Sequence, residues 1–319
     1  MEIKGFTYGF GARKGDYRSP EAIDSMEKLA ATGSEWVCIA FTVHQKRYNS
    51  TEIMFDYRNG ITDKDLTFAI DKFHSMGLKV CLKPVINCRD RVWRARIDFP
   101  DESDAGKDIY WNEWFSYYQA FLCHYAEIAQ DTNCEMFCVG CEMAGTERKE
   151  SHWRETIRLT KDIYKGPIIY NTNHGNEEQV NWFDAVDYLG VSAYYPVATG
   201  PGETEDNMYK AWLKRKDLLK AQYDKWGKKI LFAEVGVRSA AGCAAMPWDY
   251  MNSDLPFDED EQARFYSSCF NAFAKESWFA GFFWWEWSTR IYSLDKAKEN
   301  RHFDIYGKKA ADVLKKWYP

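Results

Sequence analysis

The chain has 319 residues, of which 45% are hydrophobic and 28% are charged, so it can bury the core of one large α/β barrel or of two ordinary domains. Its net charge of -6 arises from 42 basic and 48 acidic residues spread along the whole length, which argues against nucleic-acid binding. No apolar stretch approaches the roughly 18 residues of a membrane helix, and no charged-then-apolar leader opens the chain. The sequence therefore predicts a soluble cytoplasmic protein that does not bind a membrane.

A short apolar strand followed by an amphipathic helix recurs along the chain. We expect strands at residues 5–10, 36–41, 79–84, 136–141, 167–171, 188–193, 230–234 and 279–285. The helices that follow them are expected to begin near Ser19, Thr62, Tyr110, His152, Glu177, Met208, Asp258 and Lys308. Eight units of about 40 residues predict an α/β fold, a single-domain (β/α)8 TIM barrel over residues 1–319.

Local signals mark the ends of two of these helices. Ser19 followed by Pro20 offers an N-cap and a first-turn proline. Thr62 and Asp65 have the spacing of a capping box, and Gly77 is expected to end the same helix. These signals fix the helix boundaries more closely than hydrophobic periodicity alone.

The nine cysteines lie mostly inside apolar runs, as Cys38 and Cys81 do, which is typical of reduced, buried thiols. A metal site could be imagined at Cys134, Cys138 and Cys141. However, these residues straddle one predicted strand, whose alternation sends neighbouring side chains to opposite faces. We therefore expect neither a metal nor another cofactor.

Long loops follow three of the predicted strands, at residues 87–107, 238–256 and 288–307. In a (β/α)8 barrel the active site lies at the C-terminal ends of the strands, so we expect these loops to form substrate walls. Aromatic residues make up 17% of the chain, including 14 Trp. Their flat apolar faces and polar tips suit a groove for sugar rings, although a large aromatic core accounts for many of them.

Two glutamates stand at the ends of apolar strands. Glu142 follows the strand at 136–141, and Glu234 ends the strand at 230–234. These are strands four and seven, which lie across the barrel mouth from each other, so the two acids can face one cavity. Glycosidic cleavage needs such a pair: one protonated carboxyl donates a proton to the leaving oxygen, and the other attacks or activates water at the anomeric carbon. The alternative is that both acids are salt-bridged rim residues.

The sequence resembles glycoside hydrolase family 113, a β-mannanase branch of the clan A barrels. The resemblance covers nearly the whole chain and is carried by LKP at 82–84 with WR at 93–94, GCE at 140–142, DYLGVSAYYP at 187–196, FAEVGVRS at 232–239 and GFFWW at 281–285. It implies a retaining β-glycosidase with Glu142 as acid/base and Glu234 as nucleophile, acting on β-1,4-mannan fragments or manno-oligosaccharides. Many relatives carry Asn before the acid/base, where this chain has Cys141.

Aromatic residues at strand ends are further candidates. The resemblance places an aromatic residue near the nucleophile, and we expect the Tyr195 hydroxyl to hydrogen bond with Glu234. Tyr194 is the competing choice, because alternation allows only one of the two to point inward. Trp285 is expected to form the floor of the subsite that holds the glycosyl unit, with Trp284 and Trp287 packed behind it.

Polar residues and one tryptophan at other strand ends are candidates for binding sugar hydroxyls: Lys83, Asn87, Trp93, Arg94, Asn173 and His44. Each has a structural alternative, since arginines in loops are often solvated, Asn builds turns and a lone His is often a packing residue. Glu286 is a third acid, and we expect it to point away from the cleft because its neighbour Trp285 faces inward.

Two other functions remain open from the residues themselves. The same barrel would also serve xylan or another β-glucan, because two carboxylates in an aromatic cleft do not specify the sugar. A carbohydrate-binding barrel without catalysis is the alternative from another class. The partner is in each case an oligosaccharide or polysaccharide. The sequence contains no phosphate loop, Gly-x-Ser-x-Gly elbow or His-Glu-x-x-His motif.

Overall fold

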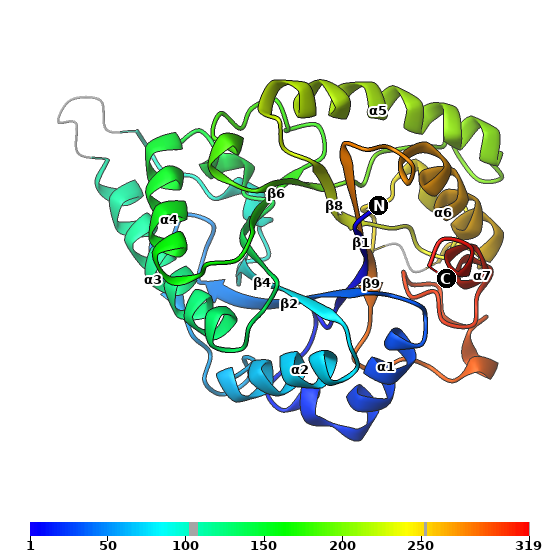
Figure 1. Cartoon of the computed structure of the whole chain (residues 1–319), viewed down its shortest axis with the longest axis horizontal. Coiled ribbons are helices and arrows are strands. Elements are labelled where there is room, and N and C mark those ends of the chain that lie inside the picture. The colour runs from blue at the N-terminus through cyan, green and yellow to red at the C-terminus, as the bar shows by residue number, and fades with distance from the viewer. Residues whose placement is uncertain (102–107, 252–253, 319) are drawn as a thin grey trace.

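The computed structural model describes residues 1–101, 108–251 and 254–318. Its centre is a closed barrel of parallel strands (Figure 1): β1 (Ile3–Tyr8), β2 (Trp36–Gln45), β4 (Lys79–Cys88), β5 (Met136–Cys141), β6 (Ile168–Asn173), β7 (Tyr188–Ser192), β8 (Ile230–Val235) and β9 (Phe279–Trp287). β1 pairs with both β9 and β2, which closes the barrel. The short strand β3 (Ile53–Met54) pairs antiparallel with the end of β2.

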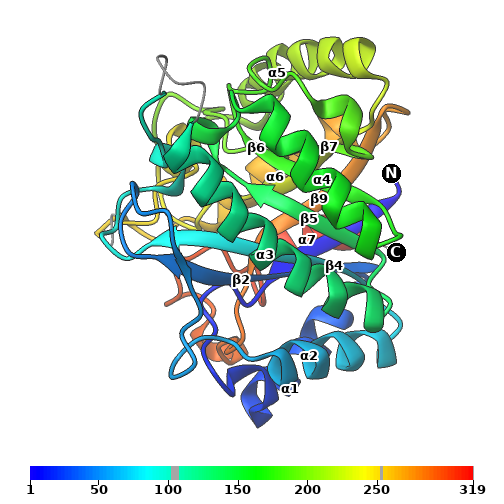
Figure 2. The same cartoon turned by 90° about the vertical axis from the view of Figure 1, so that its left-hand side faces the viewer.

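Helices surround the barrel (Figures 1 and 2): α1 (Pro20–Ala30), α2 (Asp63–Ser75), α3 (Ile109–Asp131), α4 (Glu150–Ile163), α5 (Glu205–Trp226), α6 (Glu259–Phe273) and α7 (Lys309–Lys315). The predicted (β/α)8 barrel is confirmed. Both termini lie at the same side of the barrel (Figure 2). Among the residues that the structure describes, no helix combines the length and apolar character needed to cross a bilayer.

The helix predicted to begin near Glu177 is wrong. Between β6 and β7 the structure has a single 3-10 turn, Phe183–Ala185. Gly175 adopts a positive φ of 79°, which interrupts helical backbone just after β6. The Glu177 carboxylate then accepts a hydrogen bond from Tyr195, and Trp182 Nε1 donates to the Glu147 carbonyl at 3.0 Å. These contacts hold the segment as an irregular loop.

The predicted capping signals are confirmed. The Ser19 side chain accepts a hydrogen bond from the Ala22 backbone N–H, and Pro20 opens α1. Thr62 and Asp65 form a capping box at the start of α2, which ends before Gly77 with its φ of 82°. Local backbone requirements therefore set these boundaries.

The barrel has an inner and an outer layer of buried side chains. The inner layer is small and includes thiols: Ile3, Trp36, Cys38, Cys81, Met136, Cys138, Ile169, Leu231, Ala233, Ala280 and Phe283. The outer layer lies between strands and helices and contains most of the fully buried tryptophans, among them Trp153, Trp182, Trp212 and Trp284. Much of the high aromatic content therefore belongs to this outer core rather than to a groove.

Candidate active site

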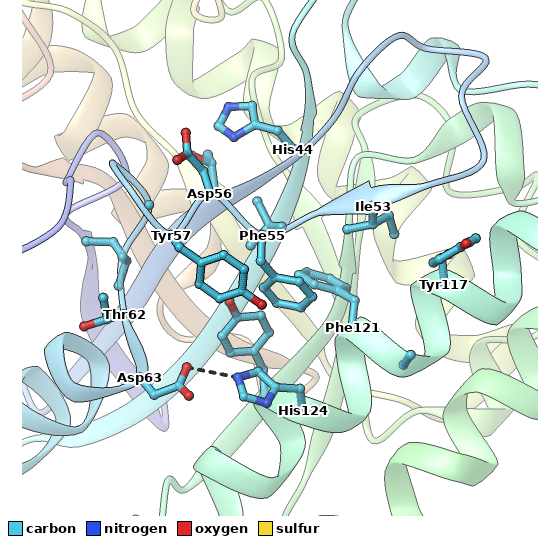
Figure 3. Close-up of a pocket in the computed structure, with 16 residues that line it drawn as sticks. His44, Ile53, Phe55, Asp56, Tyr57, Thr62, Asp63, Tyr117, Phe121 and His124 are labelled. Carbon is cyan, nitrogen blue, oxygen red and sulfur yellow. Dashed lines mark hydrogen bonds and ion pairs between the residues drawn. The ribbon is translucent and has the colours of Figure 1, made fainter.

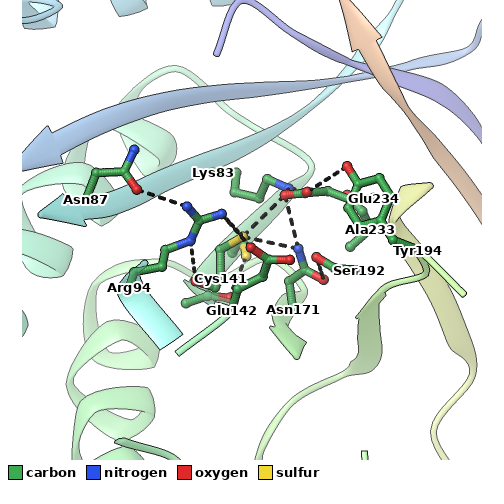
Figure 4. A network of polar contacts seen from close by, with 12 residues as sticks. Lys83, Asn87, Arg94, Cys141, Glu142, Asn171, Ser192, Tyr194, Ala233 and Glu234 are labelled. Atoms are coloured by element: carbon green, nitrogen blue, oxygen red, sulfur yellow. Dashed lines mark hydrogen bonds and ion pairs between the residues drawn. The ribbon is translucent and has the colours of Figure 1, made fainter. Parts of the chain in front are cut away.

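A β-bulge at the end of β5 brings Cys141 and Glu142 to the barrel mouth. Cys138 and Cys141 pair with Ile169 and Asn171 of β6, so β5 holds one residue more than β6 over this stretch. The Glu142 backbone then turns to a φ of 55°, and its N–H donates to the Asn171 carbonyl at 2.7 Å. Bulge and turn together interrupt the alternation of β5 and direct the Glu142 side chain to the polar network in Figure 4.

A second bulge places Glu234. Leu231 and Ala233 of β8 both face the barrel interior, so strict alternation would send Glu234 outward, as it sends Phe232. However, Phe232 and Glu234 pair with two consecutive residues of β7, and β8 again holds one extra residue. Ala233 and Glu234 can therefore both face inward.

Glu234 is surrounded by hydrogen-bond donors that lie in three other strands of the barrel and just after a fourth. Its Oε1 accepts from Lys83 Nζ at 2.6 Å, Cys141 Sγ at 3.3 Å and Asn171 Nδ2 at 3.4 Å, and its Oε2 accepts from the Tyr194 hydroxyl at 3.1 Å (Figure 4). Burial alone would raise the pKa of Glu234. The charges of Lys83 and Arg94, helped by these hydrogen bonds, outweigh burial and hold the pKa below its usual 4.5.

Lys83 is fully buried and also donates to the Ala233 carbonyl at 3.2 Å. Burial favours the neutral amine, but the Glu234 carboxylate holds the pKa of Lys83 well above its usual 10.5. Lys83 and Glu234 therefore form a buried ion pair, and Glu234 is an anion at neutral pH.

Glu142 has a different environment. Its Oε2 accepts from Arg94 at 2.7 Å and from Trp93 Nε1 at 3.3 Å. Arg94 is fixed in turn by Asn87 Oδ1 at 2.9 Å and the Cys141 carbonyl at 3.1 Å. Burial raises the pKa of Glu142 and is only partly offset by the Arg94 charge, while the nearby Glu234 charge raises it further.

One network thus holds two carboxyl groups whose pKa values are pushed in opposite directions. Burial shifts Glu142 toward the protonated form, and the nearby cations shift Glu234 toward the ionised form. A protonated carboxyl beside an ionised one can supply a proton to one atom of a ligand and a nucleophile or base to another.

The prediction that Tyr195 binds Glu234 is wrong, because Tyr194 makes this contact. Leu189 and Val191 of β7 pack in the outer layer. Tyr195 follows Val191 by four residues and therefore faces outward as well. The Tyr195 hydroxyl donates to Glu177 instead. Burial and the Glu234 charge raise the pKa of Tyr194 well above its usual 10.0, so this hydroxyl stays protonated and donates.

Trp285 lies at the barrel mouth, as predicted. Its ring contacts Phe10 edge-on with centroids 4.9 Å apart, and the Lys83 ammonium lies 6.0 Å from its centroid. Trp284 and Trp287 are fully buried in the outer layer, which confirms that they pack behind the mouth. Whether Trp285 contacts a sugar stays a prediction.

Glu286, the third acid, follows Trp285 in β9 and is half-buried. Burial raises the pKa of Glu286 to about 8, and the charges of Asp304 and Glu234 add to this effect. The direction of the Glu286 side chain stays a prediction. β9 holds one residue more than β1 between Trp284 and Trp287, so strict alternation does not apply there. A neutral carboxyl can both donate and accept hydrogen bonds.

The structure gathers four of the seven predicted sugar-binding residues into this network: Lys83, Asn87, Trp93 and Arg94. Asn173 is buried at the end of β6, and its amide has no hydrogen-bond partner among the described residues. No hydrogen bond or ion pair joins His44 to either glutamate within the described residues; His44 lines a different pocket.

Two contacts of Glu234 were not expected from the sequence. Cys141 and Asn171 both bind its Oε1, and Asn171 Nδ2 also lies 3.3 Å from Cys141 Sγ. Asn171 could have been found from the sequence. It lies two residues after Ile169, which points into the barrel, and alternation places the two side chains on the same face. Cys141 had no such signal, because the bulge that turns it inward has no sequence mark.

Comparison with known proteins gives a consistent result. Residues 6–308 match the family model for Glycoside Hydrolase Family 113. The chain is 38% identical to a β-mannanase of this family from Alicyclobacillus acidocaldarius, with 100% of this chain and 97% of that chain covered and a TM-score of 0.91. A structure described as a GH113 β-1,4-mannanase is 36% identical, with 100% and 99% covered and a TM-score of 0.91.

A β-glucuronidase from Faecalibacterium prausnitzii shares the fold alone, at 15% identity and a TM-score of 0.64, with 100% of this chain and 49% of that chain covered. A search of curated proteins found no match.

Proposed function

The chain belongs to glycoside hydrolase family 113, and we propose that it hydrolyses β-1,4-mannan fragments or manno-oligosaccharides with retention of anomeric configuration. Three solved structures that are 36–38% identical to this chain, with 97–99% of their own length covered, are described as β-mannanases. The observation that carries the proposal is the pair of buried glutamates, one with a raised and one with a lowered pKa.

In the first step that we propose, Glu234 attacks the anomeric carbon while Glu142 gives its proton to the glycosidic oxygen. The bond to the leaving sugar breaks, and a covalent glycosyl–Glu234 ester forms. The raised pKa of Glu142 keeps the proton available, and the lowered pKa of Glu234 keeps its electron pair free.

In the second step, the ionised Glu142 takes a proton from water, and the hydroxide attacks the anomeric carbon. The ester bond to Glu234 breaks, so both carboxyl groups return to their starting states. Two inversions at one carbon give net retention. Lys83 and Tyr194 hold Glu234 by its two oxygens and thereby orient it for both displacements.

All nine cysteines of the chain are free thiols, which fits a reducing compartment. We therefore propose that the enzyme acts in the cytoplasm on oligosaccharides taken up by the cell.

Tyr194→Phe is expected to lower kcat on manno-oligosaccharides by about 10- to 100-fold, because a hydrogen bond to a charged group contributes about 1.5–3 kcal/mol. Tyr195→Phe is the matched control. It should leave kcat unchanged and lower the free energy of unfolding by about 1–3 kcal/mol, because buried Glu177 loses its partner. Steady-state kinetics and urea unfolding measure the two effects. Equal loss of kcat in both variants would contradict the assignment of Tyr194.

The pH profile of kcat/KM is expected to be bell-shaped, since the active form has Glu142 protonated and Glu234 ionised. Activity falls as pH rises through the pKa of Glu142 and as pH drops through that of Glu234. Lys83→Met removes the main charge that lowers the pKa of Glu234, so the acid limb should move up by about one to three pH units. Lys79→Met, at the exposed start of β4, should leave it in place. An unmoved acid limb in Lys83→Met would refute this role.

The decisive test is product analysis on defined manno-oligosaccharides, with the anomer followed by NMR during the first turnover. We expect shorter manno-oligosaccharides with the β-configuration at the new reducing end. Parallel assays on xylo- and gluco-oligosaccharides test the sugar. Preferred cleavage of either would replace mannan as the substrate, and binding of all three without cleavage would indicate a non-catalytic barrel.

A further inference from the structure

A pocket of about 410 Å³, shown in Figure 3, is lined by neither of the two glutamates. It is formed between the end of β2, the segment at residues 53–63 and α3. None of the described residues that line it belongs to the network around Glu142 and Glu234. Its volume falls in the range of about 300–1,000 Å³ that is usual for small-molecule sites.

Aromatic rings form one wall of this pocket. Phe55 and Tyr57 stack with centroids 6.4 Å apart and planes 25° apart. Phe55 also meets the His124 ring edge-on at 5.8 Å, which ties the wall to α3. Tyr57 nevertheless exposes 81% of its surface. The wall therefore presents a flat apolar face to solvent beside the pocket. Because an aromatic side chain has few rotatable bonds, little entropy is lost when a bound ligand fixes it.

Hydrogen-bonding groups surround these rings and have unused capacity. Asp63 accepts one hydrogen bond from His124 at 2.9 Å among the described residues, although a carboxylate can accept several. Tyr57 and Tyr117 also line the pocket, and both are exposed to solvent. Asp56, in contrast, already accepts from two backbone N–H groups and from Arg89.

The segment that carries the wall is held by the rest of the fold. Lys14 binds it at two points, through its Nζ to the Tyr57 carbonyl at 3.1 Å and through its backbone N–H to the Asn59 carbonyl at 2.9 Å. Gly60 N–H closes a turn on the Asp56 carbonyl at 2.7 Å. A fixed wall reduces the entropy lost on binding.

We propose that this pocket is a second carbohydrate site, which binds a stretch of the mannan chain outside the catalytic cleft. The inference rests on the proposed function for the identity of the sugar. A hexose ring has an apolar C–H face, which fits Tyr57 and Phe55, and hydroxyls that both donate and accept, which fit Asp63, His124 and the tyrosine hydroxyls. The carboxylates of Asp56 and Asp63 disfavour an anionic ligand.

Such a site would strengthen the binding of a long substrate. A chain held at the pocket stays near the enzyme between encounters with the cleft, so polymer binding strengthens by effective concentration. A short oligosaccharide bound at the two glutamates is expected to leave the pocket empty, since none of the described lining residues belongs to their network. The pocket should therefore affect binding of polymer and leave turnover of short substrates unchanged.

Tyr57→Ala tests this inference in the full chain. Binding to soluble polymeric mannan is measured by affinity electrophoresis in a Glu234→Ala background, and turnover of mannotetraose is measured with Glu234 intact. We expect polymer binding to weaken about five- to tenfold and mannotetraose turnover to stay unchanged. Tyr57→Trp, which keeps an aromatic face, should bind like the parent. Tyr110→Ala, which removes a tyrosine that is 47% exposed at the start of α3, should also bind like the parent.

Unchanged polymer binding in Tyr57→Ala would overturn the inference. An equal loss of mannotetraose turnover would also overturn it, because the pocket would then belong to the cleft. Binding of xylan or β-glucan in place of mannan would overturn the choice of ligand. If no mannan is cleaved but Tyr57→Ala still loses mannan binding, the proposed catalytic function fails and the second site stands.

Discussion

Replacing Glu234 by alanine is expected to abolish hydrolysis of manno-oligosaccharides, with kcat reduced by at least about 10⁴-fold. Without this carboxylate no group forms the covalent intermediate, and the buried Lys83 charge loses its partner. The measurement is initial-rate kinetics on mannotetraose, with circular dichroism to verify the fold.

A small anion provides the control for this variant. The space left by the carboxylate lies beside the Lys83 ammonium, so azide is expected to enter it, attack the anomeric carbon of an activated β-mannoside and form the α-mannosyl azide. Recovery of activity with that product would support a nucleophile at this position. Turnover within about tenfold of the parent without azide would contradict it.

Replacing Glu142 by alanine is expected to lower kcat on natural oligosaccharides by about 10² to 10⁴-fold, because the leaving oxygen no longer receives a proton. Aryl mannosides whose leaving group needs no proton should lose much less in the first step. The same variant should lose the alkaline limb of the pH profile, since the raised pKa of Glu142 sets that limb. Rates on the two substrate types, measured across pH, test both statements.

Glu142→Gln is the matched variant, because it keeps the shape of the side chain and its contact with Arg94 but cannot donate the carboxyl proton. It should resemble Glu142→Ala in rate and the parent in stability. Unchanged turnover of natural substrate in either variant would show that another group is the acid. Glu286, with a pKa of about 8, would then be the first candidate to examine.

Much of the fold was predictable because its signals are local or periodic. The strand at 136–141 was predicted at its observed bounds, and the caps at Ser19 and Thr62 were correct. The helix expected from Glu177 failed because the side chains there bind neighbouring segments, and such tertiary contacts leave no periodic mark. Lys79–Cys88 runs four residues beyond the predicted strand, because pairing with the equally long β2 extends it.

The site was predictable as far as residue type and strand position define it. Glu142 and Glu234 were found because acids at the ends of apolar strands are unusual, and the family resemblance supplied their roles. The choice between Tyr194 and Tyr195 failed because the inward side of β7 was misjudged, although Leu189 and Val191 marked the outward one. The second pocket could not be predicted, because residues from β2, α3 and the 53–63 segment meet only in the folded chain.

The extra residue in β8 has a consequence for how this enzyme can change. Deleting the extra residue of β8, Ala233, would restore regular alternation and leave Glu234 on the inward side, because Leu231 would then lie two positions before it. What such a deletion removes is the Ala233 carbonyl, which accepts a hydrogen bond from Lys83. The bulge therefore lets one strand offer Lys83 both a carboxylate and a backbone acceptor, and a deletion there is expected to disturb the Lys83 ammonium more than the direction of the acid.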